Sequence, residues 1–174
     1  MQRNFGPVMQ IAWVVRDLEA AIEHWTRVMN VGPFFVFEHV PFSELRFRGI
    51  PSPVDMTAAL AYSGETQIEL IYQHNEAPSI YTEFLSAGRT GVHHVAVMTD
   101  AIEDTIARLS AEGFSLAQQG RAVQGSQFAY LETGRERGEM VELIERSPLT
   151  VEIFHRIHDA ARNWDGRTPI GRFT

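Results

Sequence analysis

An internal repeat is the feature of this sequence that most limits its possible folds. Residues 10–22 read Gln-Ile-Ala-Trp-Val-Val-Arg-Asp-Leu-Glu-Ala-Ala-Ile, and residues 94–106, which begin 84 positions later, read His-Val-Ala-Val-Met-Thr-Asp-Ala-Ile-Glu-Asp-Thr-Ile. Each segment opens with a β-branched run that suits a buried strand and then reaches an aspartate, Asp17 or Asp100, that can cap a helix. Each half of the chain is therefore predicted to begin with a strand followed by a helix.

A second repeated segment closes each half. Residues 67–71 (Gln-Ile-Glu-Leu-Ile) match residues 140–144 (Met-Val-Glu-Leu-Ile), so both halves end in a strand that carries a glutamate. Between the opening and closing segments, four further strands are predicted at 34–39, 56–62, 114–119 and 127–132. The order predicts an α+β fold made of two tandem βαβββ modules.

The remaining segments set the expected boundaries. Residues 8–76 and 92–146 are predicted as the two modules, 77–91 as a linker with a short helix at 79–87, and 147–174 as a C-terminal helix and tail. Residues 41–53 are interpreted as an irregular excursion rich in aromatic residues. In the C-terminal helix, expected to be capped by Thr150, one apolar stripe is formed by Ile153, Phe154, Ile157, Ala161 and Trp164. Such a stripe is expected to cover an open sheet or to form a homodimer contact.

Composition narrows the possible partners and chemistry. The formal net charge of −7, without a run of basic residues, argues against nucleic acid and anionic membranes as partners. The lack of a long apolar stretch at the N-terminus or elsewhere predicts a cytoplasmic, soluble protein. The chain has no cysteine, so a metal would need histidine, carboxylate or amide ligands.

Four polar residues occupy equivalent places in the two halves: Gln10 and His94 on the opening strands, and Glu69 and Glu142 on the closing strands. Any one of them alone is more simply an exposed strand residue or a hydrogen-bonded core histidine. A carboxylate between aliphatic neighbours in both closing strands is unusual, however, because a buried carboxylate is costly unless it is paired. The joint recurrence favours a mixed nitrogen and oxygen site for one divalent ion: Zn, Ni, Co, Mn or Mg.

These segments resemble the vicinal oxygen chelate superfamily, which includes glyoxalase I, methylmalonyl-CoA epimerase, extradiol dioxygenases and bleomycin resistance proteins. The resemblance covers about residues 8–146 and rests on the opening strand and helix, on Gly91-Val92-His93-His94 and on the closing residues 141–144. It implies a cupped mixed sheet in which each opening and each closing strand supplies one metal ligand. Carried over, the ligands are Gln10, Glu69, His94 and Glu142, whereas His93 is not a ligand.

The subfamilies are separated by their motifs. The ligand set resembles that of zinc glyoxalase I, whereas the linker at 79–85 followed by Gly91-Val92-His93-His94 is similar to the epimerase group. Residues 72–75 (Tyr-Gln-His-Asn) stand where many glyoxalases have Asn-Trp-Gly, and arginines for the glutathione carboxylates cannot be assigned. Extradiol dioxygenases hold iron with two histidines and one glutamate, and the set in this sequence, with Gln10 and Glu69, fits that pattern poorly. The main non-enzyme alternative is a metal-free binding protein similar to bleomycin resistance proteins.

The resemblance implies a metal-dependent isomerase, epimerase or lyase that moves a proton next to a carbonyl. Glu142 is the expected base and Glu69 its counterpart on the opposite face. An apolar or aromatic substrate is hinted at by the phenylalanines Phe34, Phe35, Phe37, Phe42 and Phe47. Arg46, Arg48 and Arg121 keep a carboxylate or a CoA thioester open as the alternative. His155 and His158 are interpreted as surface or interface residues.

Overall fold

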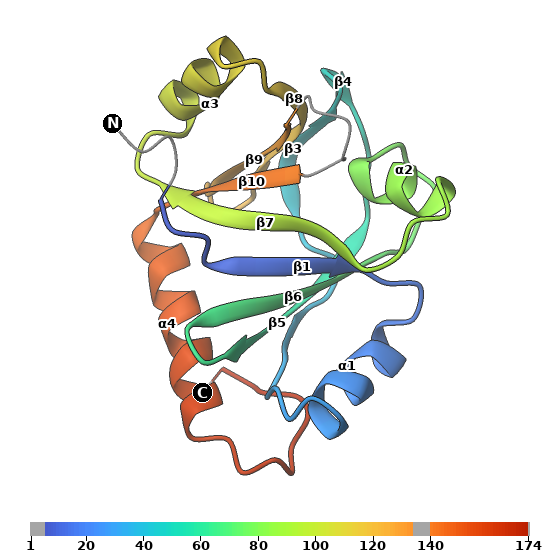
Figure 1. Cartoon of the computed structure of the whole chain (residues 1–174), viewed down its shortest axis with the longest axis vertical. Coiled ribbons are helices and arrows are strands. Elements are labelled where there is room, and N and C mark those ends of the chain that lie inside the picture. Colours follow the sequence, from blue (N-terminus) through green and yellow to red (C-terminus); the bar gives the residue numbers. More distant parts are fainter. Residues whose placement is uncertain (1–5, 134–139, 174) are drawn as a thin grey trace.

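The computed structural model describes residues 6–133 and 140–173 and contains one curved, ten-stranded sheet with helices around it (Figure 1). The elements in chain order are β1 (Gln10–Val14), α1 (Leu18–Arg27), β2 (Phe35–Phe37), β3 (Phe42–Phe47), β4 (Ile50–Pro51), β5 (Met56–Ser63), β6 (Thr66–Gln73), α2 (Ile80–Ser86), β7 (Val92–Thr99), α3 (Ile102–Ala111), β8 (Ser115–Ala122), β9 (Gln127–Glu132), β10 (Met140–Glu145) and α4 (Pro148–Arg162). This arrangement confirms the predicted α+β fold with a mixed, cupped sheet.

The two halves join at the centre of the sheet. The strand order is β2-β5-β6-β1-β7-β10-β9-β8-β3-β4. Each opening strand pairs in parallel with the closing strand of its own half, β1 with β6 and β7 with β10, whereas β1 and β7 pair antiparallel. The four strands that carry the repeated polar residues are therefore neighbours.

Alternation along the closing strand divides its side chains between two faces. Leu70 is fully buried among Ile22, Ala59 and Ile68, on the face that α1 covers. Ile71 lies in a separate core on the other face with Tyr81 and Tyr130. Glu69 is on this inner face with Ile71, because successive strand residues point to opposite sides. The predicted orientation of residues 67–71 is confirmed.

Residues 41–53 are not irregular, and that prediction is wrong. They form β3 and β4, and β3 pairs antiparallel with β8, for example Leu45 with Gly120. A Cβ at position 120 would lie 2.9 Å from the Glu44 carbonyl oxygen and 2.4 Å from the Phe128 ring, so glycine allows this close approach. The partner strand is far away in the sequence, which is why local pattern did not reveal the pairing.

Two predicted helix caps are also wrong, whereas the third is confirmed. Asp17 accepts a hydrogen bond from the Ala20 N–H at 2.9 Å. Asp100 lies one residue before the N-cap of α3 and contacts Arg146 instead. For α4 the cap is Ser147, which accepts from the Thr150 N–H at 3.1 Å, and the helix begins at Pro148.

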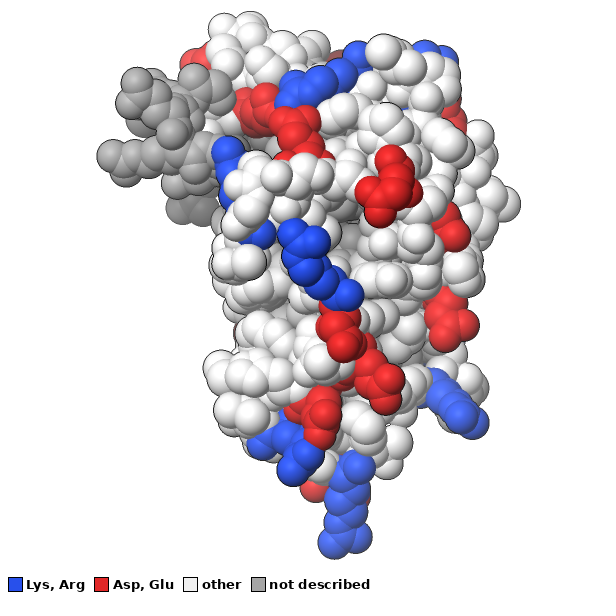
Figure 2. Space-filling view, turned by 90° about the vertical axis from the view of Figure 1, so that its right-hand side faces the viewer, with Lys and Arg blue, Asp and Glu red and all other residues white. Residues whose placement is uncertain are grey.

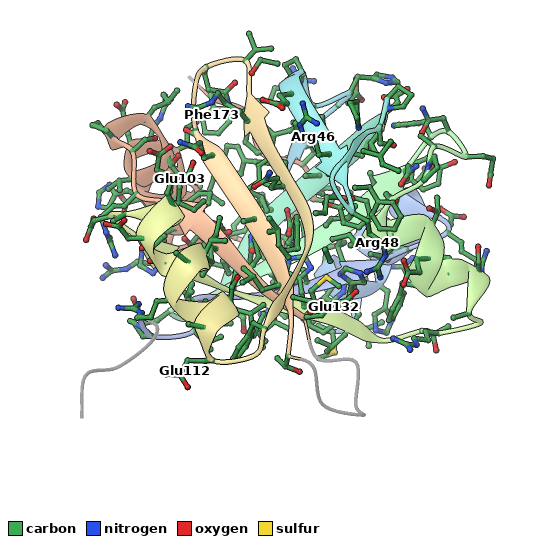
Figure 3. All side chains as sticks on the ribbon, turned by 90° about the horizontal axis from the view of Figure 1, so that it is seen from above. Arg46, Arg48, Glu103, Glu112, Glu132 and Phe173 are labelled. Atoms are coloured by element: carbon green, nitrogen blue, oxygen red, sulfur yellow. The ribbon has the colours of Figure 1, made fainter. Side chains whose placement is uncertain are left out.

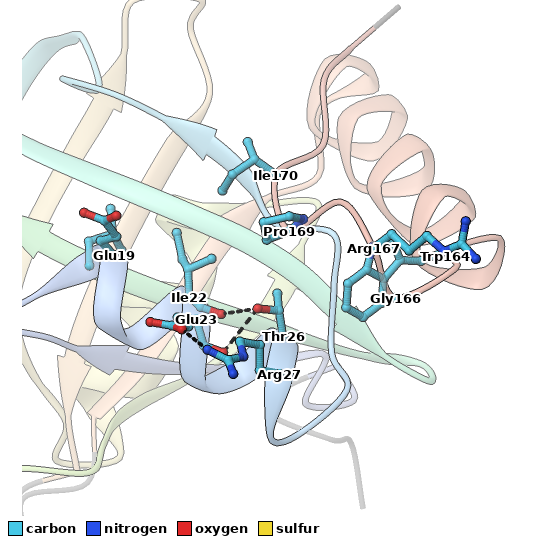
Figure 4. A pocket seen from close by; sticks show the side chains of 11 residues that line it. Glu19, Ile22, Glu23, Thr26, Arg27, Trp164, Gly166, Arg167, Pro169 and Ile170 are labelled. Carbon is cyan, nitrogen blue, oxygen red and sulfur yellow. Dashed lines mark hydrogen bonds and ion pairs between the residues drawn. The ribbon is translucent and has the colours of Figure 1, made fainter.

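The C-terminal segment after α4 folds back toward α1. The Phe34 N–H donates to the Pro169 carbonyl, and the Gly171 N–H donates to the Phe34 carbonyl. Between this segment and α1 lies a hollow of about 710 Å³, with Trp164 and Ile170 on one side and Ile22 on the other (Figure 4). The hollow lies on the outer face, away from the repeated polar residues.

The surface charge is mixed. On the face drawn in Figure 2, arginines alternate with aspartates and glutamates, and no broad basic patch is visible there. Of the described helices, none has both the length and the apolar character needed to cross a membrane.

Candidate metal centre

Four adjacent strands each place one repeated polar residue on the inner face of the sheet. Glu69 comes from β6, Gln10 from β1, His94 from β7 and Glu142 from β10. The ligand-type atoms of Glu69, His94 and Glu142 all lie within 4.8 Å of one another. The His94 Nε2 atom is 3.2 Å from Glu142 Oε2 and 3.3 Å from Glu69 Oε2. Residues that the sequence separates by more than 130 positions thus share one site.

Burial dominates the electrostatics of this site. Burial raises the pKa of the Glu69 carboxyl, and the nearby Glu142 charge raises it further. Burial alone would lower the pKa of His94, but its interactions with Glu142 and Glu69 outweigh burial and raise that pKa to about 9. The imidazole therefore carries a proton at neutral pH and partly offsets the two acidic groups. A divalent cation would offset both carboxylates more completely.

Three buried atoms in the site lack a partner in good hydrogen-bond geometry among the described residues, although His94 Nε2 and Glu69 Oε2 lie 3.3 Å apart as an ion pair. They are Gln10 Oε1, Glu69 Oε2 and His94 Nε2. The amide nitrogen of Gln10 donates to Gln67 Oε1 at 2.7 Å, which leaves the Gln10 oxygen free. Buried polar atoms are normally paired, so this cluster calls for an explanation. Amide oxygen, carboxylate oxygen and imidazole nitrogen are all suitable ligands for a divalent ion such as Zn, Ni or Co.

His93 is hydrogen-bonded to His94 on the side away from the carboxylates. The two Nδ1 atoms are 2.8 Å apart, and His93 Nε2 lies 3.4 Å from the Ile80 carbonyl oxygen. Burial, together with the charge of His94, lowers the pKa of His93 to about 3. His93 is therefore neutral and accepts the Nδ1 proton of His94. The sequence predicted only that His93 is not a ligand.

Two buried tyrosines border the site, and the sequence analysis missed both. The Tyr81 hydroxyl donates to the Tyr130 hydroxyl at 3.0 Å, and the Tyr130 ring lies 5.0 Å from the His94 ring. Burial, followed by the charge of Glu142, raises the pKa of both phenols. Tyr130 is paired with Glu142 in the sheet register, so correct strand alignment would have revealed it.

A cavity of about 300 Å³ opens next to the site, with Gln10, Glu69 and Glu142 among its lining residues. Of the phenylalanines singled out in the sequence, Phe37 lines it, whereas Phe34 is buried under α1. Ile153 and Phe154 of α4 also line it, although the sequence analysis did not connect the C-terminal helix with the site. No sequence signal links these residues, because their placement depends on how α4 packs.

A second group of possible ligands lies at the surface. His39, Asp55 and His74 have ligand-type atoms within 4.8 Å of one another. The His39 and His74 rings are stacked, 4.4 Å apart at 24°, so their in-plane lone pairs do not converge on one point. His39 Nδ1 is 2.7 Å from Asp55 Oδ1, and His74 Nε2 is 2.8 Å from Thr57 Oγ1. These hydrogen bonds account for the group without an ion.

The two histidines of α4 have different surroundings. His155 is exposed and lies 3.5 Å from Asp159, as expected of a surface residue. His158 is half-buried and packs edge-on against Tyr62. His158 is therefore not an exposed surface residue, and its interpretation as an interface residue stays a prediction.

Comparison with known proteins supports the architecture. Curated protein sequences give no significant match. Methylmalonyl-CoA epimerase from Mycobacterium tuberculosis is similar in structure, with a TM-score of 0.61 and 18% identity over 87% of this chain and 95% of that one. A variant of methylmalonyl-CoA epimerase from Streptomyces coelicolor, in complex with 2-nitronate-propionyl-CoA, has a TM-score of 0.56 and 18% identity over 83% of this chain and 96% of that one. A hypothetical protein from Bacillus halodurans has a TM-score of 0.58 and 19% identity over 81% of this chain and 94% of that one.

At such low identity, these structures show a shared fold and nothing more. The sequence itself provides the stronger link. Residues 9–130 match the family model described as Glyoxalase/Bleomycin resistance protein/Dioxygenase superfamily. Because the matched segment exceeds half of the chain and the sheet has the arrangement described above, the resemblance seen in the sequence is confirmed, and the chain belongs to the glyoxalase, bleomycin resistance protein and dioxygenase superfamily.

Proposed function

We propose that the chain is a metal-dependent isomerase, epimerase or lyase that moves a proton next to a carbonyl group. Gln10, Glu69, His94 and Glu142 would hold one divalent ion. The observation that carries the proposal is the group of three buried ligand-type atoms on adjacent strands that lack a well-formed hydrogen bond, beside a cavity large enough for a small substrate. A metal-free binding protein would have no reason to bury two carboxylates around one imidazole.

The residues divide the chemistry between them. When bound, the ion would supply Lewis-acid stabilisation of the negative charge that develops on the substrate oxygen. Glu142 removes the proton from the carbon next to the carbonyl. In an epimerisation, Glu69 would enter the cycle protonated and give its own proton to that carbon, while Glu142 keeps the abstracted proton until it exchanges with solvent.

Exchange of a carbon-bound proton for deuterium is the direct test of this function. Metal-loaded protein in D₂O would be incubated with 2-oxo thioesters, hemithioacetals and aromatic ketones, and exchange followed by NMR. Glu142→Gln and Glu69→Gln should each lower the exchange rate by about 10²–10⁴-fold, the usual contribution of a general base. Glu38→Gln is the matched control, because Glu38 lines the same cavity but is exposed.

The outcomes separate the candidate functions. Retained exchange in both single variants, with metal still bound, would rule out the glutamates as bases. Metal binding without exchange of any probe by the wild-type chain would favour a non-catalytic binding protein. The metal content of each variant must be measured alongside, because both glutamates are also proposed as ligands.

His93 is expected to set the tautomer of His94. Metal binding through Nε2 requires the His94 proton on Nδ1, and His93 Nδ1 is placed to accept it at 2.8 Å. His93→Leu removes this acceptor and should weaken Zn²⁺ binding by about 10–100-fold, the typical cost of losing such a partner. His93→Gln retains an acceptor and should bind closer to wild type. Competition with a chromophoric chelator measures both, and equal affinities for His93→Leu and wild type would contradict this role.

A further inference from the structure

The C-terminal helix α4 spans the cavity and connects the two halves of the sheet. At its N-terminal end, the hydroxyls of Ser147 and Thr150 each lie 3.0 Å from the Ser126 hydroxyl, in the turn between β8 and β9. Further along, Ile157 is fully buried against Phe35 and Leu60 of the first half. Because it is held at both ends, α4 is a fixed wall of the cavity.

The side chains that α4 adds to the cavity are mostly apolar. Leu149, Thr150, Ile153 and Phe154 line it from the helix, opposite Phe37 and Leu60 of the sheet. Phe37 is supported from behind by Phe173, whose ring lies 5.9 Å away. The cavity therefore combines two buried glutamates with an apolar wall.

The described residues that line this cavity include neither lysine nor arginine. Their polar members away from the metal centre are neutral, such as Gln124 and Ser126, or acidic, such as Glu38. A nucleotide-bearing thioester or a free carboxylate needs cationic or backbone donors to offset its charge. Away from the ion, an anionic group would meet only neutral or acidic side chains among the described lining residues.

The arginines considered from the sequence are engaged elsewhere. Arg48 pairs with Glu83 at 2.8 Å and Glu132 at 2.7 Å, and Figure 3 shows Arg48 and Glu132 close together and away from Phe173. Arg46 contacts Glu44 at 2.6 Å. Arg121 donates to the Gly125 carbonyl at 2.8 Å. None of the three lines the cavity.

From this arrangement we infer that α4 is the specificity element of the site and that the substrate is a small, uncharged molecule with an apolar or aromatic group. The apolar group lies against Ile153 and Phe154 while the reacting oxygen faces the glutamates. This inference rests on the proposed function, because it places the reacting end of the substrate at the metal centre. It also separates this chain from the structurally similar epimerase that is described in complex with a CoA thioester.

Two hydroxamates and one thioester test the inference by isothermal titration of the Ni²⁺-loaded protein. Acetohydroxamate and benzohydroxamate present the same pair of adjacent oxygens to the ion, but only the second has an aromatic ring. Benzohydroxamate should bind at least about tenfold more tightly, which corresponds to one well-buried apolar contact. Propionyl-CoA, which carries phosphates, should bind more weakly than benzohydroxamate.

Variants of α4 test whether this helix forms the apolar wall of the cavity. Phe154→Ala should remove most of the preference for benzohydroxamate and leave acetohydroxamate affinity within about twofold, because only the ring contact is lost. Phe154→Leu, which preserves most of the packing, should keep part of the preference if the alanine variant folds poorly. Val151→Ala is the matched control, because Val151 is on the same helix but is 41% exposed and outside the cavity.

The results distinguish this inference from the proposed function. Nickel binding with no preference for benzohydroxamate, an unchanged preference in Phe154→Ala, or tighter binding of propionyl-CoA would each overturn the inference alone. Failure of the wild-type chain to bind nickel or any of the other four candidate ions would overturn the proposed function, and this inference with it.

Discussion

We expect the wild-type chain to bind about one equivalent of a divalent metal and His94→Ala to lose it. His94 supplies the central nitrogen, 3.2 Å from Glu142 and 3.3 Å from Glu69, and alanine would leave two buried carboxylates without a cationic partner. The loss of affinity should exceed the roughly 10–100-fold that removal of an outer partner costs. Glu142→Ala should behave in the same way, because it removes one of the two proposed anionic ligands.

Elemental analysis of tag-free protein after reconstitution with Zn²⁺ or Ni²⁺ measures this effect. His74→Ala is an informative control, because it disrupts the exposed group of His39, Asp55 and His74 and leaves the buried site intact. It should retain the metal. If His74→Ala lost the metal while His94→Ala retained it, the ion would belong to the surface group and the proposed centre would be wrong.

Metal binding should also produce a large, pH-dependent increase in stability. An ion at about 1,000 times its Kd adds about 4 kcal/mol to the free energy of unfolding. For a chain of this length, that corresponds to a rise in Tm of about 8–16 °C. Thermal unfolding with the ion and with excess chelator measures the difference. Equal Tm values in the two conditions, with metal binding shown independently, would mean that the ion does not bind at a folded site.

The sign of the pH dependence follows from His94. Its pKa is raised from 6.5 to about 9 in the metal-free protein, so its contribution to stability is complete below pH 6.5 and is lost as the pH rises toward 9. The raised pKa of Glu69 acts with the same sign in the range of carboxyl titration. His93, with its pKa lowered to about 3, acts with the opposite sign but only below pH 6.5. The ion and a proton compete for the Nε2 atom of His94, so the ion binds more easily once this proton is lost. The stabilisation by the ion should therefore be larger at pH 8.5 than at pH 6.5, and a smaller effect at pH 8.5 would contradict this assignment.

Much of the fold was predictable because it depends on short-range patterns. The alternation in residues 67–71 placed Leu70 on the helix side and Glu69 on the inner side, as the structure confirms. The repeated opening segments predicted α1 and its Asp17 cap. Gln10, Glu69, His94 and Glu142 were recognised because the repeat placed them at equivalent positions, and their role as ligands remains a prediction.

The parts that were missed depend on contacts between distant segments. Residues 42–47 are a strand only because β8 offers an open edge, which Gly120 allows them to approach. Asp100 was expected to cap α3 but lies one position too early, next to Arg146. Neither outcome is visible in the local sequence, because both depend on the geometry of a neighbour supplied by another part of the chain.

The sequence by itself determined the family, the type of fold and the chemical character of the four repeated residues. Tertiary structure alone decided that three of their ligand-type atoms meet within 4.8 Å, that His93 supports His94, and that Ile153 and Phe154 of α4 complete the cavity. The physical reason is the range of the interactions. Strand alternation and helix periodicity are repeated every few residues, whereas the pairing of β1 with β7 and the packing of α4 on β5 bring together residues separated by dozens of positions.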